Sequence, residues 1–260
     1  MQPYLFFDLD GTLLVYHEDG PKITDHTKTV LRKLQDSGFK LYIASGRPWA
    51  FLDQDLISFG FDGYILVNGA CVYEHDQILA RHPLGEERVK EVVQNFEKRG
   101  LEYVYECQPY SYLKEEFKKL ETFYARCSVD FDKIKRLVPA DVAKHTLKLE
   151  AWHDTPENNA YIESLKNMGF GIMGGDLTYE IYDATINKAT GIQDIMQAHH
   201  VPKEMTYAFG DNLNDLEMLA TVGHAYAMGN AIDEIKAIAD EVVGRNDEDG
   251  VAIQLEKLFL

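Results

Sequence analysis

Apolar and polar positions along this chain follow two periods, one typical of buried strands and one typical of amphipathic helices. The first apolar run, residues 4–7, contains no polar position and predicts a strand covered on both faces, as in parallel sheets. Residues 24–38 then place apolar side chains every three or four positions and end at Gly38, which predicts a helix. The alternation continues with a strand at 40–45, a helix at 49–60, a strand at 64–68 and a hairpin at 71–82 with its turn near 75–77.

The pattern changes between residues 83 and 182. There the strands alternate apolar and polar positions more regularly, as strands of an antiparallel sheet with one covered face do. This block predicts a helix at 86–100, a strand at 101–107, an amphipathic segment at 115–127, a strand at 146–152, a helix at 155–169 and strands at 170–175 and 178–184.

The earlier pattern returns after residue 186. The expected elements are a helix at 187–200, a strand at 206–211, a helix at 214–223, a strand at 224–228 and helices at 231–240 and 251–260. Strands that alternate with helices predict a parallel α/β sheet. We therefore expect a doubly wound, Rossmann-like α/β core formed by residues 1–82 and 183–260, with an inserted α/β domain at residues 83–182.

Composition and charge narrow the classes of function. The chain has 260 residues, 45% of them hydrophobic and 27% charged, which is typical of a globular protein. A formal net charge of -17 argues against binding of nucleic acid, which requires clustered Lys and Arg. No window has the roughly 18 apolar residues that span a bilayer, and Asp8 and Asp10 interrupt any signal-peptide core. We expect no membrane partner.

The cysteine content predicts neither a disulfide framework nor a zinc site. Cys71, Cys107 and Cys127 are odd in number and widely spaced. Thiols of this kind are usually buried or indifferent, and they are consistent with a reducing cytoplasm. We expect a cytoplasmic protein that is a monomer or a homodimer.

Small or acidic polar residues follow three strands of the predicted core. Asp8 and Asp10 end the first strand, Ser45 ends the second, and Asp211 ends the strand at 206–211. Because ligands of open α/β sheets bind at the carboxyl ends of the strands, we expect these side chains to converge. Two carboxylates ~4 Å apart repel by about 4 kcal/mol at an effective dielectric near 20, so the group needs a cation. Hard oxygen ligands of this kind suit Mg²⁺.

Four short motifs carry a resemblance to a known family. The segments DLDGT, ASGR, NK before a helix, and GDNLND resemble the motifs of haloacid dehalogenase-type phosphatases, specifically the Cof-like branch. The resemblance covers the whole chain, because that branch carries a late-inserted α/β cap where residues 83–182 lie. One segment departs from the pattern: ATINKATG has Ala184 and Ala189 at positions where the family commonly has glycine.

The resemblance implies catalytic and metal-binding roles for the acidic residues. It implies that Asp8 is the nucleophile that forms an aspartyl-phosphate and that Asp10 is the general acid and base. It also implies that Asp8, the backbone carbonyl of Asp10, and Asp211 bind Mg²⁺. Asp215, at the start of a helix beside Asp211, is expected to act on the metal through water.

Further residues are expected at the phosphate and at the hinges. The resemblance implies that Ser45 and Lys188 hold the phosphoryl group, and a lysine at a helix start, where the dipole is unfavourable, is consistent with a bound anion. The remaining expected residues are Gly11, Gly46 and Asn214 toward phosphate, and Arg47, Asn68 and Gly69 toward either the substrate or the hinge into the insertion.

The sequence thus predicts a Mg²⁺-dependent phosphatase that acts on a small phosphorylated metabolite. A phosphomutase of the same architecture, or a phosphate-binding regulatory protein without catalysis, are the alternatives. Sugar phosphates are the default substrates, and pyridoxal phosphate or a flavin nucleotide stay open. Candidate specificity residues in the insertion are Tyr110, Tyr112, Tyr179 and Glu180.

Overall fold

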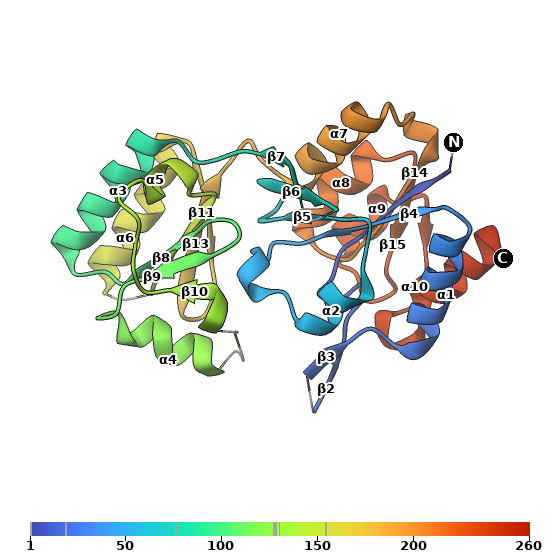
Figure 1. The fold of residues 1–260 in the computed structure, drawn as a ribbon, viewed down its shortest axis with the longest axis horizontal. Helices are drawn as coiled ribbons and strands as arrows, with labels where there is room; N and C mark the ends of the chain where they lie inside the picture. Colours follow the sequence, from blue (N-terminus) through green and yellow to red (C-terminus); the bar gives the residue numbers. More distant parts are fainter. Residues whose placement is uncertain (1, 19, 76, 127–128, 130, 154) are drawn as a thin grey trace. The chain divides into compact units, whose positions relative to one another are not determined.

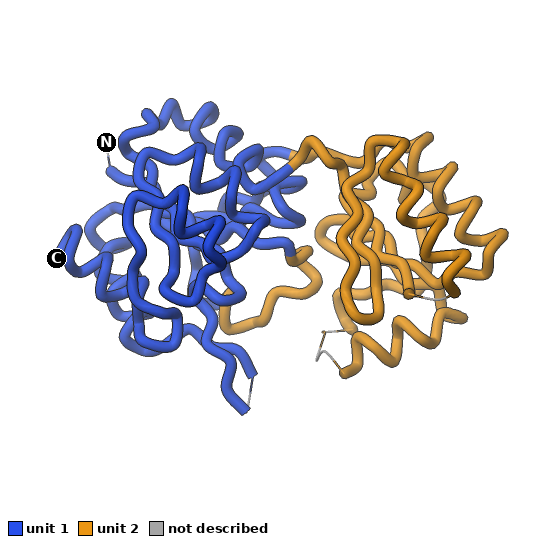
Figure 2. Tube along the Cα trace, turned by 180° about the vertical axis from the view of Figure 1, so that it is seen from behind, with its two compact units in different colours: residues 1–46, 57–80, 187–260 blue, residues 47–56, 81–186 orange. Residues whose placement is uncertain are grey.

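The computed structural model describes residues 2–18, 20–75, 77–126, 129, 131–153 and 155–260. It divides into two compact units (Figure 2). The first unit comprises Met1–Gly46, Ile57–Ala80 and Asn187–Leu260, and the second comprises Arg47–Leu56 and Arg81–Ile186. Residues 47–56, expected in the core, therefore group with the second unit. The reading of these units as catalytic core and cap stays a prediction.

The first unit is built on a sheet with strand order β16-β15-β14-β1-β4-β5-β6-β7 (Figure 1). The strands are β1 Tyr4–Phe7, β4 Lys40–Ala44, β5 Gly63–Leu66, β6 Cys71–Glu74, β7 Gln77–Arg81, β14 Thr206–Gly210, β15 His224–Ala227 and β16 Glu241–Val242. A separate short hairpin, which the sequence pattern did not indicate, joins β2 Val15–His17 to β3 Gly20–Lys22.

The helices of the first unit cover both faces of this sheet (Figure 1). They are α1 Asp25–Asp36, α7 Lys188–His199, α8 Leu216–Thr221, α9 Asp233–Ile238 and α10 Gly250–Phe259, with 3₁₀ turns η4 Lys203–Met205, η5 Leu213–Asp215 and η6 Asn246–Glu248. The 3₁₀ turn η1 Trp49–Phe51 groups with the second unit, and the boundary between the units falls within α2 Gln54–Phe59. Helix α1 packs beside α10, and α7 packs beside α8. The doubly wound α/β core predicted from the sequence is confirmed.

Strand β1 lies in the middle of the parallel part of the sheet. It runs parallel to β14 on one side and to β4 on the other, with Phe7 level with Phe209 and with Ile43. All four residues of β1 are buried, which explains their unbroken apolar run. The residues that follow β1, β4 and β14 therefore emerge at the same edge of the sheet.

One predicted helix is divided in two. Residues 49–60 were expected to form a single helix, but η1 ends at Phe51 and α2 begins at Gln54. Leu52 between them has an extended backbone with ψ of 132°, and a helix cannot pass through that conformation.

The second unit contains a sheet with order β10-β9-β8-β11-β13-β12, antiparallel except between β10 and β9. Its elements are α3 Glu86–Arg99, β8 Tyr103–Glu106, β9 Ser111–Leu113, α4 Lys118–Arg126, η2 Phe131–Lys133, β10 Ile134–Lys135, α5 Val142–His145, β11 Lys148–Trp152, α6 Pro156–Ser164, η3 Leu165–Met168, β12 Phe170–Gly174 and β13 Thr178–Asp183. The antiparallel pairing agrees with the alternation in the sequence.

The two faces of this second sheet pack against different helices. Tyr103 and Leu149 belong to one apolar cluster together with side chains of α3 and α6. Val104 and Leu113 belong to another cluster with Leu120 and Tyr124 of α4. Successive strand residues thus alternate between two covered faces.

Two further expectations concern the whole chain. Cys71 and Cys107 are buried and free, whereas Cys127 and Asp76 of the expected turn lie outside the described residues. Within the part of the chain that the structure describes, each helix is too short or too polar to cross a membrane.

Candidate active site

The polar residues that follow the central strands do come together. Asp8 follows β1 directly, and its backbone N–H donates to the carbonyl of Phe209, 3.0 Å away. Asp211 follows β14, and Ser45 follows β4. The parallel register of the three strands therefore brings these residues to one edge of the sheet, as expected from the rule for α/β sheets.

Lys188 is the first residue of α7, and its side chain is fully buried. Its ammonium donates to Asp8 Oδ1 and, at 2.6 Å, to Asp215 Oδ1. Burial alone would lower the pKa of Lys188, but the charges of Asp215 and Asp8 outweigh it and raise the pKa. The lysine is therefore held as a cation between two carboxylates, which offsets the unfavourable dipole at the helix start.

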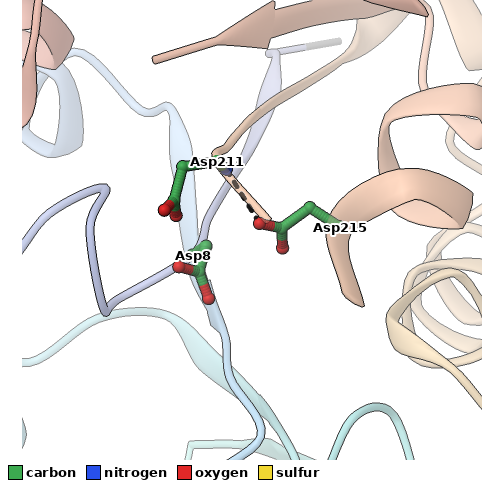
Figure 3. Close-up of side chains that lie close together, drawn as sticks. All are labelled: Asp8, Asp211 and Asp215. Carbon is green, nitrogen blue, oxygen red and sulfur yellow. Dashed lines mark hydrogen bonds between the residues drawn. The ribbon is translucent and has the colours of Figure 1, made fainter. Parts of the chain in front are cut away.

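Asp215 binds three donors of the first unit. One carboxylate oxygen accepts from Lys188, and the other accepts from the backbone N–H groups of Asp211 at 2.9 Å and Asn212 at 3.1 Å. Figure 3 shows the contact with Asp211. Gly210 permits this arrangement, because a Cβ at that position would lie 2.6 Å from Cβ of Asp215. Asp215 therefore fixes both the lysine and the loop that carries Asp211.

Asp8, Asp211 and Asp215 form a cluster suited to a metal ion. One carboxylate oxygen from each lies within 4.8 Å of the others, and Figure 3 shows the Asp215 carboxyl group turned toward the other two. Burial raises the pKa of Asp8 well above its usual value despite Lys188. Burial and the neighbouring Asp215 raise the pKa of Asp211 to about 6. Three carboxylates around one lysine leave an excess of negative charge, and their hard oxygen atoms fit Mg²⁺.

Two residues that the sequence analysis did not single out fix the loop of Gly11. Thr12 Oγ1 donates to Asp211 Oδ1 at 3.1 Å, and Asn230 Nδ2 donates to the carbonyl of Gly11 at 2.8 Å. Gly11 has φ of +87°, and a Cβ there would lie 2.4 Å from a carboxylate oxygen of Asp211. Thr12 belongs to the DLDGT motif, whereas nothing in the local sequence distinguishes Asn230.

Asp10 is not part of the carboxylate cluster. Its Oδ1 accepts a hydrogen bond from the hydroxyl of Tyr16 on β2. Tyr16 was missed, because the hairpin that carries it was not predicted.

Asn68, Asn214 and the loop after Ser45 also lie together. Asn214 Nδ2 donates to Asn68 Oδ1 at 3.2 Å, and the backbone N–H of Asn68 donates to the carbonyl of Ser45 at 3.0 Å. A Cβ at Gly46 would approach the Asn68 amide to 3.2 Å. Gly69, with φ of +96°, passes so close to α7 that a Cβ would lie 1.9 Å from the carbonyl of Asn187.

The remaining candidates have partners within the second unit. Arg47 Nη1 lies 3.5 Å from Asp53 Oδ2 and from the carbonyl of Phe51. Tyr179 stacks on His153 and packs with Tyr112 in the apolar cluster beside α3. Glu180, on the opposite face, accepts from Lys148 at 2.7 Å.

Residues 5–255 match the family of haloacid dehalogenase-like hydrolases. The chain belongs to this family. It is 30% identical to 5-amino-6-(5-phospho-D-ribitylamino)uracil phosphatase YitU of Bacillus subtilis, over 99% of this chain and 98% of YitU. It is 25% identical to phosphatase YwpJ of the same organism, over 97% of this chain and 98% of YwpJ.

Solved structures agree with the family. A protein from Geobacillus kaustophilus has a TM-score of 0.86 and 27% identity, with 99% of both chains covered. The HAD subclass IIB sugar phosphatase BT4131 has a TM-score of 0.78 and 25% identity, again with 99% of both chains covered. The expected fold and family are confirmed, and the chain is an enzyme of this family.

Proposed function

We propose that this enzyme is a Mg²⁺-dependent phosphatase that hydrolyses small sugar or polyol phosphates through an aspartyl-phosphate. The observation that carries the proposal is the contact of the buried Lys188 ammonium with Asp8 and Asp215, next to Asp211. A carboxylate at a strand end, beside a fixed cation, is placed as a nucleophile toward an anionic ester.

In the proposed reaction, a carboxylate oxygen of Asp8 attacks the phosphorus and the bond to the ester oxygen breaks. Asp10 gives its proton to the departing alkoxide. A water molecule then attacks the phosphorus of the acyl phosphate while Asp10 takes a proton from it, which releases phosphate and restores Asp8. Asp8, Asp211 and the backbone carbonyl of Asp10 would hold Mg²⁺, with Asp215 acting through water.

The chain's own donors hold the transferred group. When bound, Mg²⁺ supplies positive charge that offsets the repulsion between the carboxylates and the phosphate. Lys188 adds a fixed positive charge, and its contact with Asp215 keeps its Nζ in place. We assign Gly11, Ser45, Gly46 and Asn214 to the phosphate as well. Asn68 and Gly69 are assigned to the hinge.

The substrate class rests on the relatives. YitU acts on a phosphoribityl compound by its name, and BT4131 is named a sugar phosphatase. Both names point to a phosphate ester on a chain or ring with several hydroxyl groups. We propose that the second unit selects the leaving group, and that the enzyme works in the cytoplasm as a monomer or homodimer.

A panel of phosphomonoesters tests the proposal. With Mg²⁺, the parent enzyme should release phosphate from sugar or polyol phosphates, and Asp8→Asn should abolish release because an amide is not a nucleophile toward phosphorus. The control Asp36→Asn, at an exposed position at the end of α1, should behave as the parent. Acid quenching should trap label from a ³²P-substrate on the parent and not on Asp8→Asn. A folded Asp8→Asn variant with activity within about tenfold of the parent would refute the covalent route.

A further inference from the structure

A short hairpin follows the loop of Gly11 in the first unit. Its strands, β2 Val15–His17 and β3 Gly20–Lys22, pair antiparallel and form a two-stranded sheet of their own, which projects from the unit in Figure 1. An isolated two-stranded hairpin is only marginally stable in water. The position of this hairpin therefore depends on contacts that it and its flanking loop make with the rest of the unit.

Two asparagines fix the loop from which the hairpin starts. Asn230 Nδ2 donates to the carbonyl of Gly11 at 2.8 Å. Asn246 Nδ2 donates to the carbonyl of Leu14, also at 2.8 Å. The backbone N–H of Asn246 donates in turn to Asn230 Oδ1 at 3.0 Å, which joins the two anchors. Carbonyls at both ends of the loop are thus held by one linked pair, and the hairpin leaves the loop from a fixed backbone.

Tyr16 connects this hairpin to Asp10. Val15 is buried, whereas Tyr16, on the opposite face of β2, is 62% exposed. The Tyr16 hydroxyl nevertheless donates to Asp10 Oδ1. A hydrogen bond from a hydroxyl to a carboxylate is stronger than one between neutral groups. Because an exposed ring contributes little to the core, the distinguishing feature of Tyr16 is the acceptor that its hydroxyl contacts.

Asp10 is held by a different donor from the carboxylates of the cluster. Lys188 holds Asp8 within the cluster, whereas Asp10 lies outside it and accepts from Tyr16. A general acid must lie within hydrogen-bond reach of the departing oxygen. An error of about 1 Å in placement can reduce a rate about 10²-fold. A donor that fixes the Asp10 carboxyl group therefore bears directly on proton transfer.

We propose that Tyr16 is a positioning residue, which orients the Asp10 carboxyl group for proton transfer to the leaving group. This inference rests on the proposed phosphatase function. The Tyr16 hydroxyl holds Oδ1 of Asp10, which directs Oδ2 to the departing ester oxygen. Oδ2 gives its proton to the alkoxide in the first step and takes a proton from the attacking water in the second. Tyr16 keeps its own proton and acts only through Asp10.

The competing explanation is that the contact serves only to hold the hairpin in place. In that case, loss of the hydroxyl would lower the stability of the protein, or disturb the loop of Gly11 and slow all substrates equally. A positioning role instead makes the effect depend on how much the leaving group needs protonation. The two explanations therefore predict different kinetics.

The first test compares two leaving groups at one pH and saturating Mg²⁺. Tyr16→Phe keeps the ring and removes only the hydroxyl. Its kcat for the sugar or polyol phosphate that the parent hydrolyses fastest should fall about 10-fold, with KM within about twofold. Its kcat for 4-nitrophenyl phosphate should fall at most about threefold, because this leaving group needs little protonation. The matched control His17→Ala, at an exposed position of the same strand, should behave as the parent.

A double-mutant cycle tests whether Tyr16 acts through Asp10. In the Asp10→Asn background, Tyr16→Phe should change kcat for the sugar or polyol phosphate by less than about twofold, because the acid that it positions is absent. A second loss as large as that in the parent background would show that Tyr16 acts independently of Asp10, and it would overturn the proposal.

The contact is also measurable without catalysis. In protein labelled with ¹³C at the aspartate side-chain carboxyls, the NMR signal of Asp10 is identified as the one lost in Asp10→Asn. It should move in Tyr16→Phe and stay in place in His17→Ala. The Tm from circular dichroism should change by less than about 2 °C in Tyr16→Phe, because the ring is exposed. An Asp10 signal that does not move, or a larger fall in Tm, overturns the proposal.

The kinetic outcomes separate the role of Tyr16 from the proposed function. A parent enzyme that hydrolyses no phosphomonoester refutes the phosphatase function and the role of Tyr16 with it. An active parent whose Tyr16→Phe variant has the same ratio of kcat values for the two substrates refutes the role of Tyr16 alone and retains the phosphatase function.

Discussion

Replacement of Asp215 by asparagine should destabilise the first unit severely, although the two side chains have nearly the same shape. Asp215 accepts from Lys188 Nζ at 2.6 Å and from the backbone N–H groups of Asp211 and Asn212. Asparagine has one acceptor oxygen. If that oxygen faces the backbone, the amide NH₂ group faces the buried Lys188 ammonium; in the other orientation two part-buried backbone N–H groups lose their acceptor.

The size of the loss follows from the donors left without a partner. Each unsatisfied buried donor costs about 1–3 kcal/mol, and removal of one partner of a buried ion pair costs about 3–5 kcal/mol. We take about 3–5 kcal/mol for Asp215→Asn, because Lys188 retains its contact with Asp8. At about 2–4 °C per kcal/mol for a chain of this size, Tm should fall by roughly 6–20 °C.

Differential scanning calorimetry in the presence of a chelator measures this shift without a contribution from bound metal. Asp36→Asn, which removes an exposed carboxylate at the end of α1, serves as the control and should change Tm little. A double-mutant cycle with Lys188→Met should give a coupling free energy of at least about 1 kcal/mol, since the two residues are in contact. A Tm within about 2 °C of the parent, or additive effects in the cycle, would show that the buried contact does not hold this loop.

Three further outcomes are expected. Asp10→Asn should slow hydrolysis of a sugar phosphate by about 10² to 10⁴ and slow an aryl phosphate less, because the aryl leaving group needs less protonation; equal losses would argue against Asp10 as the acid. EDTA should abolish activity and Mg²⁺ should restore it, and Asp211→Ala should require more Mg²⁺; an unchanged Mg²⁺ titration would remove Asp211 from the metal site. Glu106 has its pKa raised from 4.5 to about 8, so the folded state binds more protons than the unfolded chain between these values. Its contribution to the free energy of unfolding should therefore be full below pH 4.5 and decline as the pH rises toward about 8, and urea titrations of Glu106→Gln should lack this decline.

The sequence alone was sufficient to predict that Asp8, Ser45 and Asp211 lie at one edge of the sheet. An unbroken apolar strand followed by polar residues is a local pattern, and the rule for parallel sheets then brings the strand ends together without further information. Tyr16 and Asn230, which donate to Asp10 and to the carbonyl of Gly11, could not be found in this way. Tyr16 lies on a short hairpin without an apolar period, and Asn230 reaches Gly11 across 219 positions of sequence.

The division of residues 49–60 between two units was also beyond the sequence pattern. Their apolar positions fit one helix, but Phe51 packs against Tyr124 and Lys133 donates to the carbonyl of Leu52, which groups the first turn with the second unit. The spacing of the apolar residues is the same for one continuous helix and for two separate helical segments, so the sequence cannot distinguish them. Tertiary contacts decide between the two.

Lys188 and Lys148 are buried charged side chains at positions where a lysine is unfavourable. Their surroundings compensate the charge in different ways. Lys188 stands at a helix start, and Lys148 lies on a strand between apolar neighbours; each contacts two carboxylates. Around Lys188, the second oxygen of Asp215 is satisfied by two backbone N–H groups, so this part of the site is organised by the protein itself. Around Lys148, Glu180 Oε1 accepts from the ammonium, but Glu106 Oε1 and Glu180 Oε2 accept no hydrogen bond within the described chain. Local conflicts in natural sequences concentrate at functional sites, and the Lys188 conflict lies within the carboxylate cluster of the candidate active site.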